Sequence, residues 1–400
     1  MTHVKWSRLA CVIGAFLALA ISASPLGAQG VTTAAATGVV KDTQGAVIPG
    51  ASVVAVHEPS GSTYDTVTQA DGRYFIQGMR VGGPYKVTAS LPGFSTEVQT
   101  IPYLTLGVAQ ALDFSLKVAA VAETITVVGQ SDPVFSSTHT GAATAVLREE
   151  LATLPTISGR INDMTRLSPE YTSGNGGGGF AGADNRMNNI TVDGSYFNNS
   201  FGLGNQPGDR TGVAPISLEA IEQVQVSVAP FDVRQGNFVG AGVNTVTRSG
   251  TNTFVGSGYY RYRNESYVGT VAAGQTVNPG TFKTTNAGEW LGGPILPNKL
   301  FFFESFESQK DQRPLTTYVA NPGGAPAVGN TTRVLASDMD TLSSFLSSKF
   351  KYDTGPYQGI SKLTPAKPFL VKGDYNVNSQ NKVTFRYNML NSSTPVNLSG

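Results

Sequence analysis

The stretch from Ile216 to Arg263 constrains the fold more than any other part of this chain. Between Gln223 and Val228 it alternates polar residues with valines, as a half-buried strand does. After an Arg-Ser-Gly-Thr-Asn turn at 248–252, residues 254–263 place aromatic or small side chains on one face and polar or cationic ones on the other. Such a strand suits a position between lipid and a watery lumen. We therefore interpret the stretch as a junction between a compact domain and the first strand of a membrane barrel.

Composition agrees with extended β structure that contains many turns. Charged residues make up 14% of the chain, whereas soluble proteins average about 25%. Glycine is abundant, with 46 residues in 400. The net charge is only +1, and no basic cluster is interleaved with aromatic residues, so we expect no nucleic-acid partner.

The N-terminus has the three-part pattern of a secretory signal peptide, which we expect over residues 1–30. Lys5 and Arg8 precede an apolar run from Leu9 to Ile21 that is too short to span a bilayer core of about 30 Å, although a membrane anchor is the alternative. The single cysteine, Cys11, lies inside this segment, so the mature chain would form no disulfide. Because no run of about eighteen apolar residues follows, a mature chain that enters a membrane would do so as a β-barrel.

Residues 31–118 are expected to form a small β-sandwich, because short β-prone runs alternate with turn signals such as Asp71-Gly72 and Pro92-Gly93. The expected strands are 37–41, 51–57, 63–69, 74–77, 85–91, 96–101 and 111–116. The sequences TGVVKDTQGAVIPGASVVAV and ADGRYFIQGMRVGGPYKVTASLPGF resemble the carboxypeptidase-regulatory-like domain, which implies a prealbumin-like fold related to carbohydrate-binding modules. His57 and His139, the only histidines of the mature chain, lack the spacing of zinc ligands, so we expect no catalysis, metal or cofactor.

A linker over residues 119–130 carries the one candidate partner-binding segment. It consists of Glu123, Thr124, Ile125, Thr126, Val127 and Val128. This segment resembles the box with which outer-membrane receptors pair with the energy-transducing protein TonB, and the resemblance implies strand addition to a partner sheet. The alternative is an ordinary strand that closes the sandwich or opens the next domain.

Residues 131–250 mix both kinds of secondary structure. We expect a short helix from Val146 to Leu154, a second helix with Ile157, Ile161, Met164 and Leu167 on one face, and a strand from Asn189 to Val192. Gly177, Gly179 and Gly182 fit a phosphate-loop spacing but lack its flanking strand and helix, so an exposed loop is expected. The sequences LPTISGRINDMTRLSP and NNITVDGSYFNN resemble the plug domain of TonB-dependent receptors.

Residues 251–400 are expected to begin a barrel, with strands at 252–264, 283–292, 300–309, 368–377 and 382–390. The connections alternate long and short, as in outer-membrane barrels, and the longest carries an expected helix from Ser337 to Phe350. The sequences GPILPNKLFFFESFE and KGDYNVNSQNKVTFRYN resemble the Oar-like branch of TonB-dependent receptors. Arg261 and Arg263 are expected to face the lumen, against the plug.

The expected fold is therefore mainly β: a prealbumin-like sandwich, an α/β plug and the start of an antiparallel transmembrane barrel. A barrel that holds a plug needs about 22 strands, so we expect the sequence to be an N-terminal fragment. The resemblance implies a non-enzymatic TonB-dependent receptor in the outer membrane of a Gram-negative-type bacterium, with its N-terminal domain in the periplasm. Its partners would be TonB, outer-membrane lipid and a bulky nutrient such as an oligosaccharide or a peptide. The alternative is a surface adhesion or carbohydrate-binding protein without transport.

Overall fold

The structure, a computed structural model, describes most of the chain after the N-terminal segment. The described residues are 32–118, 125–128, 143–154, 159–174, 177–199, 206–229, 235–236, 238–272, 274–276, 279–324 and 326–395. The expected signal peptide and residues Glu123 and Thr124 lie outside these ranges.

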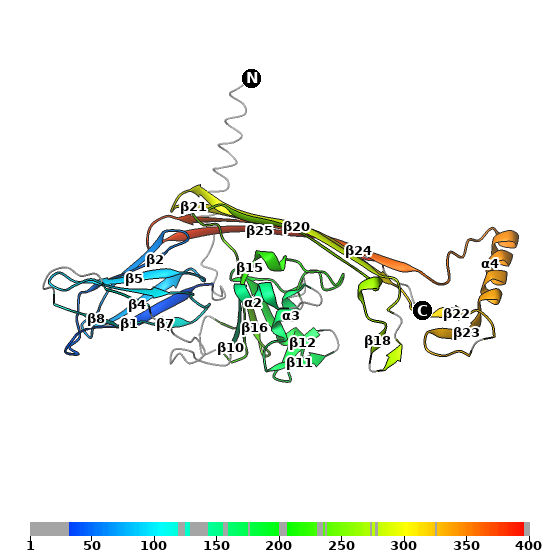
Figure 1. Cartoon of the computed structure of the whole chain (residues 1–400), viewed down its shortest axis with the longest axis horizontal. Helices are drawn as coiled ribbons and strands as arrows, with labels where there is room; N and C mark the ends of the chain where they lie inside the picture. Colours follow the sequence, from blue (N-terminus) through cyan, green and yellow to red (C-terminus); the bar gives the residue numbers. More distant parts are fainter. Residues whose placement is uncertain are drawn as a thin grey trace, which may run out of the picture.

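The N-terminal part is a sandwich of two sheets (Figure 1). One sheet has the order β4-β1-β7, with β8 also paired to β1, and the other has the order β3-β2-β5-β6-β9. The strands are β1 (Ala34–Asp42), β2 (Ser52–His57), β3 (Ser62–Val67), β4 (Arg73–Met79), β5 (Tyr85–Ser90), β6 (Glu97–Ile101), β7 (Ala109–Ala111), β8 (Phe114–Leu116) and β9 (Ile125–Val128). Every second residue of β2 is buried, as the alternation of its sequence requires. The strand expected at 111–116 is divided into β7 and β8. Between them, the Asp113 carboxylate accepts the backbone N–H of Val39 in β1, and the Leu112 carbonyl accepts the hydroxyl of Tyr74 in β4.

The central part, which we call the plug, is an α/β unit around a sheet of order β10-β15-β16-β13-β14. Its strands and helices are β10 (Ala143–Leu147), α2 (Arg148–Thr153), α3 (Ile161–Thr165), β13 (Asn189–Val192), β14 (Ser195–Tyr196), the 3-10 helix η3 (Leu218–Ala220), β15 (Ile221–Ser227) and β16 (Gly242–Thr247). The expected strand 189–192 matches β13.

Three local expectations for the plug were wrong. The second expected helix is only the short α3, Leu167 lies beyond its end and is exposed, and Ile157 lies outside the described residues. Val146 belongs to strand β10, where it is buried and pairs with Val224, so the helix expected from Val146 begins only at Arg148. The overlooked start signal is Glu150, whose carboxylate accepts the Leu147 backbone N–H at 2.8 Å. The glycine-rich segment expected to be a loop forms the hairpin β11 (Tyr171–Gly174) and β12 (Gly177–Phe180). Close approach of the Tyr171 ring to the backbone at Gly178 explains the glycine there.

The C-terminal part is an antiparallel five-stranded sheet in sequence order, which we call the wall. It consists of β17 (Val255–Asn264), β20 (Lys283–Leu296), β21 (Leu300–Pro314), β24 (Ser361–Asn376) and β25 (Lys382–Ser392). The middle strands are longer than expected, because their polar residues at 310–314 and 361–367 stay paired beyond the apolar alternation. Apolar alternation marks the part of a strand that faces lipid, not the whole strand.

The connections of the wall alternate long and short, as expected. Short turns occupy 297–299 and 377–381, whereas 265–282 and 315–360 form long loops. The second long loop carries β22 (Val319–Asn321), β23 (Thr331–Leu335) and α4 (Ala336–Phe350), the last beginning one residue before the expected helix. Figure 1 shows β18 (Val271–Ala272) and α4 at the end of the wall opposite the sandwich.

The two faces of the wall differ in chemistry. The outer face carries exposed Tyr260, Tyr375, Val383, Phe385 and Met389, whereas the face toward the plug buries Phe301, Phe303, Leu370, Lys372 and Asp374. Among the described residues, no helix combines the length and apolar character needed to cross a bilayer. The mainly β fold class, with sandwich, plug and an unclosed barrel sheet, is confirmed.

Candidate functional site

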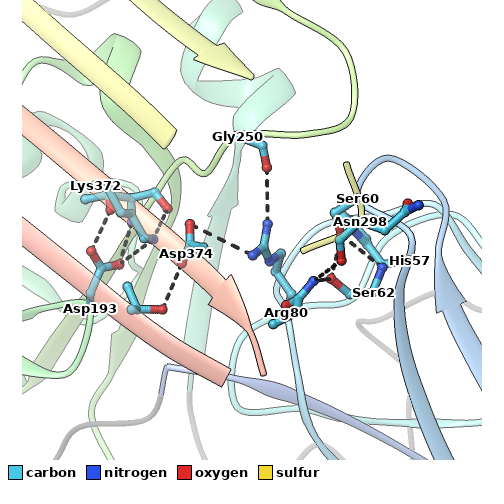
Figure 2. Close-up of polar contacts among 12 residues, drawn as sticks. His57, Ser60, Ser62, Arg80, Asp193, Gly250, Asn298, Lys372 and Asp374 are labelled. Carbon is cyan, nitrogen blue, oxygen red and sulfur yellow. Dashed lines mark hydrogen bonds and ion pairs between the residues drawn. The ribbon is translucent and has the colours of Figure 1, made fainter. Parts of the chain in front are cut away.

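The most concentrated polar site lies where the plug, the wall and the sandwich meet (Figure 2). At its centre is Asp193, in the turn between β13 and β14, with a left-handed φ of 44° that aspartate tolerates better than most residues. Its carboxylate accepts the backbone N–H of Thr247 at 2.8 Å and the Thr247 hydroxyl at 2.5 Å. These bonds fix the turn to the end of β16, so the carboxylate has a defined position.

Two cations from the wall face this carboxylate. Lys372 Nζ on β24 lies 3.6 Å from Asp193 Oδ1, and Arg386 Nε on β25 lies 3.5 Å from Oδ2. Lys372 also donates to the carbonyl of Thr247 at 3.0 Å. All three side chains are largely buried, which removes the screening that makes exposed ion pairs weak. The plug turn is therefore held electrostatically between two neighbouring wall strands.

The charges continue toward the sandwich. Asp374, two residues beyond Lys372 on β24, accepts the Thr384 hydroxyl at 2.8 Å and lies 3.9 Å from Arg80 Nη2. Arg80, which follows β4 of the sandwich, donates through Nη1 to the carbonyl of Gly250 at 3.3 Å. We call Arg80, Asp193, Lys372, Asp374 and Arg386 the ionic junction. It joins the sandwich, the plug and the wall through charges that are largely buried.

A neutral polar cluster continues the contact on the sandwich side of Arg80 (Figure 2). His57 Nδ1 lies 2.6 Å from Ser60 Oγ, and Ser60 in turn contacts Ser62. Asn376 Nδ2 donates to Ser62 Oγ at 2.9 Å and to the Asn298 carbonyl at 3.0 Å. Burial, reinforced by the positive charge of Arg80, lowers the pKa of His57 from 6.5 to about 3. His57 is therefore neutral at ordinary pH.

A second contact between plug and wall surrounds Glu219 in η3. Its carboxylate binds Arg148 of α2 at 2.8 Å and Arg261 of β17 at 2.9 Å. Burial opposes ionisation of Glu219, but the hydrogen bonds and charges of these two arginines lower its pKa below the ordinary value. Arg261 thus contacts the plug as expected, whereas Arg263 lies over the ring of Phe282 at 5.4 Å.

The segment 248–254 connects plug strand β16 to wall strand β17. The guanidinium of Arg248 lies 3.6 Å from the centroid of the Trp290 ring, a cation–π contact. Burial, with the nearby Arg148, lowers the pKa of Arg248 to about 10. A Cβ at Gly250 would lie 2.2 Å from the Phe302 carbonyl oxygen, so only glycine fits at this position.

The candidate partner-binding segment is only partly described. Ile125, Thr126, Val127 and Val128 form β9, which pairs in parallel with β6 from Glu97↔Ile125 to Thr100↔Val128. Glu123 and Thr124 lie outside the described residues. The backbone therefore has the arrangement of the alternative considered above, a strand that closes the sandwich, and contact with TonB stays a prediction.

The ionic junction was not predicted from the sequence. The sequence contains one signal: Lys372 and Asp374 lie two residues apart in an expected wall strand, and Asp193 precedes Gly194 at the end of an expected plug strand. The sequence did not show that Asp193 would meet that wall strand, or that Arg80 would reach it. Within the described ranges, no cluster of three or more His, Cys, Asp and Glu residues is arranged to hold a metal ion.

Comparison with known proteins agrees with this architecture. Residues 35–117 match the carboxypeptidase regulatory-like domain, and residues 246–400 match the outer membrane beta barrel domain. The chain is 29% identical over 226 residues to the TonB-dependent transporter Oar of Myxococcus xanthus, a match that covers 54% of this chain and 20% of that protein.

Two solved structures are similar at low sequence identity. The outer membrane transporter YddB of Escherichia coli has a TM-score of 0.43 at 14% identity, over 64% of this chain and 34% of that one. The siderophore receptor PirA of Acinetobacter baumannii has a TM-score of 0.41 at 15% identity, over 63% of this chain and 32% of that one. This chain thus spans a fifth of the curated relative and about a third of the solved chains.

These matches show two domains in the chain, a carboxypeptidase regulatory-like domain and, after the plug, an outer membrane beta barrel domain. The chain is similar to the TonB-dependent transporter Oar. The expected outer-membrane location is confirmed. The curated relative Oar is named as a transporter rather than as an enzyme, in agreement with the expectation of a non-enzymatic chain.

Proposed function

We propose that this chain is the gating portion of a TonB-dependent outer-membrane transporter that imports a bulky nutrient such as an oligosaccharide or a peptide. The observation that carries the proposal is the ionic junction, in which Asp193 of the plug is held by Lys372 and Arg386 of the wall. When a buried ion pair separates, both charges regain their hydration energy. That gain offsets much of the lost Coulomb attraction, so a buried ionic contact between two parts can be reversed. That property suits a plug that must stay closed at rest and move under load.

In this proposal TonB supplies the load through Glu123–Val128. An extended segment of this kind pairs with a partner by main-chain hydrogen bonds and needs few specific side chains. Similarity to a TonB-dependent transporter supports the assignment. The plug then leaves the wall at Asp193 and at Glu219, which form the ion pairs between plug and wall strands in the described part of the chain.

The test uses the full-length receptor in the outer membrane. Deleting Glu123–Val128, or replacing these six residues with a Gly-Ser linker of equal length as the control for spacing, should abolish capture by the TonB periplasmic domain. Both variants should also lose TonB-dependent uptake of fluorescent oligosaccharides and peptides, while surface attachment is retained. If uptake persists in both variants, TonB does not act through this segment. If the unmodified receptor binds these probes but never imports them, an adhesion or carbohydrate-binding function replaces transport.

A further inference from the structure

The sandwich is attached to the plug by a specific contact, which we call the seam. Its residues are Val81, Tyr103 and Leu106 of the sandwich and Glu222, Gln223, Gln225 and Val246 of the plug. Leu106 belongs to the loop between β6 and β7, and the two glutamines lie on β15. The seam therefore joins the sandwich loop 102–108 directly to a central strand of the plug sheet.

Two plug glutamines bond to both backbone groups of one sandwich residue. The Leu106 N–H donates to Gln223 Oε1 at 3.0 Å, and Gln225 Nε2 donates to the Leu106 carbonyl at 2.8 Å. This pattern imitates a strand pair, because Gln223 and Gln225 lie two residues apart on one face of β15. Both glutamine side chains and Leu106 are buried, so the bonds are shielded from competing water.

Apolar packing and a further polar contact complete the seam. Leu106, Val81 and Val246 form one buried cluster, with Tyr103 against it. The Tyr103 hydroxyl lies 3.4 Å from Glu222 Oε1. Burial raises the pKa of Glu222, and the charges of Arg248 and Arg148 oppose that shift. Buried apolar contact combined with paired polar groups is typical of a rigid interface rather than of a loosely tethered domain.

The same sandwich strand meets both the seam and the TonB segment. β6 pairs with β9 from Glu97 to Thr100, ends at Ile101, and continues into Tyr103 and Leu106 of the seam. Only the end of β6 and the first residues of the following loop separate Thr100, which pairs with β9, from Leu106, which contacts the plug. A path of paired backbone and hydrogen bonds therefore leads from 125–128 through β6 and Leu106 to β15.

We propose that the N-terminal sandwich is a force-transmitting element that couples the TonB segment to plug strand β15 through the seam. This inference rests on the proposed function, since it takes TonB as the source of the load. It gives the carboxypeptidase regulatory-like domain a mechanical role in this chain. If the seam is broken, TonB should still bind the segment Glu123–Val128, but this binding should no longer open the plug.

The experiment reads plug opening by the reactivity of a buried thiol, so it requires no known substrate. Ser227 is buried near the end of β15, and the expected mature chain has no cysteine, so S227C provides a single conservative reporter. In cells, a membrane-impermeant maleimide should label S227C several-fold faster with TonB present than without it. The seam variants Q223A/Q225A and L106A should each lose this difference while capture by the TonB periplasmic domain remains unchanged.

The matched control is Q44A/Q69A, two exposed glutamines of the same sandwich, which should keep the TonB-dependent labelling. L106A leaves every plug residue in place, so a shared defect of L106A and Q223A/Q225A cannot come from damage to β15 alone. If seam variants retain TonB-dependent labelling, the sandwich does not transmit the load and the coupling inference is overturned. If deletion of Glu123–Val128 leaves TonB-dependent labelling intact, the proposed function itself fails, which is a different outcome.

Discussion

Asp193 holds the plug against the wall, because its carboxylate contacts Lys372, Arg386 and Thr247. D193N keeps the shape but leaves two buried cations without their counter-charge. Removing one partner of a buried ion pair costs about 3–5 kcal/mol. We expect hydrogen exchange of β13 and β16 in the full-length receptor to become much faster. D184N, which affects an exposed pair with Arg186, is the control and should leave exchange unchanged. Equal effects of the two variants would contradict a special role for Asp193.

His57 makes the stability of the sandwich depend on pH, and the sign of this dependence follows from the His57 pKa of about 3. An unfolded histidine takes up a proton below about 6.5, whereas folded His57 stays neutral until about pH 3, so the unfolded state binds more protons in between. The free energy of unfolding should therefore fall as pH drops from about 6.5, by up to about 1.4 kcal/mol per pH unit. Calorimetry of the sandwich transition in the full-length receptor should show this slope. H57Q should flatten this slope; a slope that survives H57Q would assign the effect to another group.

At the scale of elements, each wall strand has two faces with different requirements. Tyr260 near the middle of β17 is 67% exposed on the outer face, whereas Ser257 lies on the opposite face of the same strand. A lysine facing lipid at the bilayer midplane costs about 2–4 kcal/mol. We expect Y260K to lower the stability of the full-length barrel in bilayers by about this amount and S257K to lower it far less, as measured by urea unfolding. Similar losses for both would show that the faces are assigned wrongly.

The sequence predicted those strands in which apolar side chains on one face alternate with polar side chains on the other. The alternation of Val383, Phe385 and Met389 with polar residues predicted β25, and their exposure in the structure shows the same face. Contacts between distant segments were not predicted, because no periodicity records them. Arg80 lies between the expected strands 74–77 and 85–91, and its contacts with Gly250 and Asp374 depend on how the sandwich, the plug and the wall come together.

Across the three parts together, apolar packing and charged contacts both join neighbouring parts. One core fills the sandwich, and a second is shared by the plug and the inner face of the wall through Trp290, Phe303 and Leu370. The ionic junction and Glu219 form the borders of that shared core. The shared apolar core and the ion pairs of Asp193 and Glu219 together hold the plug in one position against the wall.

The contact between Ser62 and Asn376 joins residues 314 positions apart. Local strand pairs form before contacts of such long range, because closing a long loop has an entropic cost that only later contacts repay. The sandwich can therefore fold before the wall, while its contact with the wall requires the hairpin of β24 and β25. The Ser62–Asn376 bond is therefore expected to form after the sandwich and the wall hairpin that carries Asn376 have each folded.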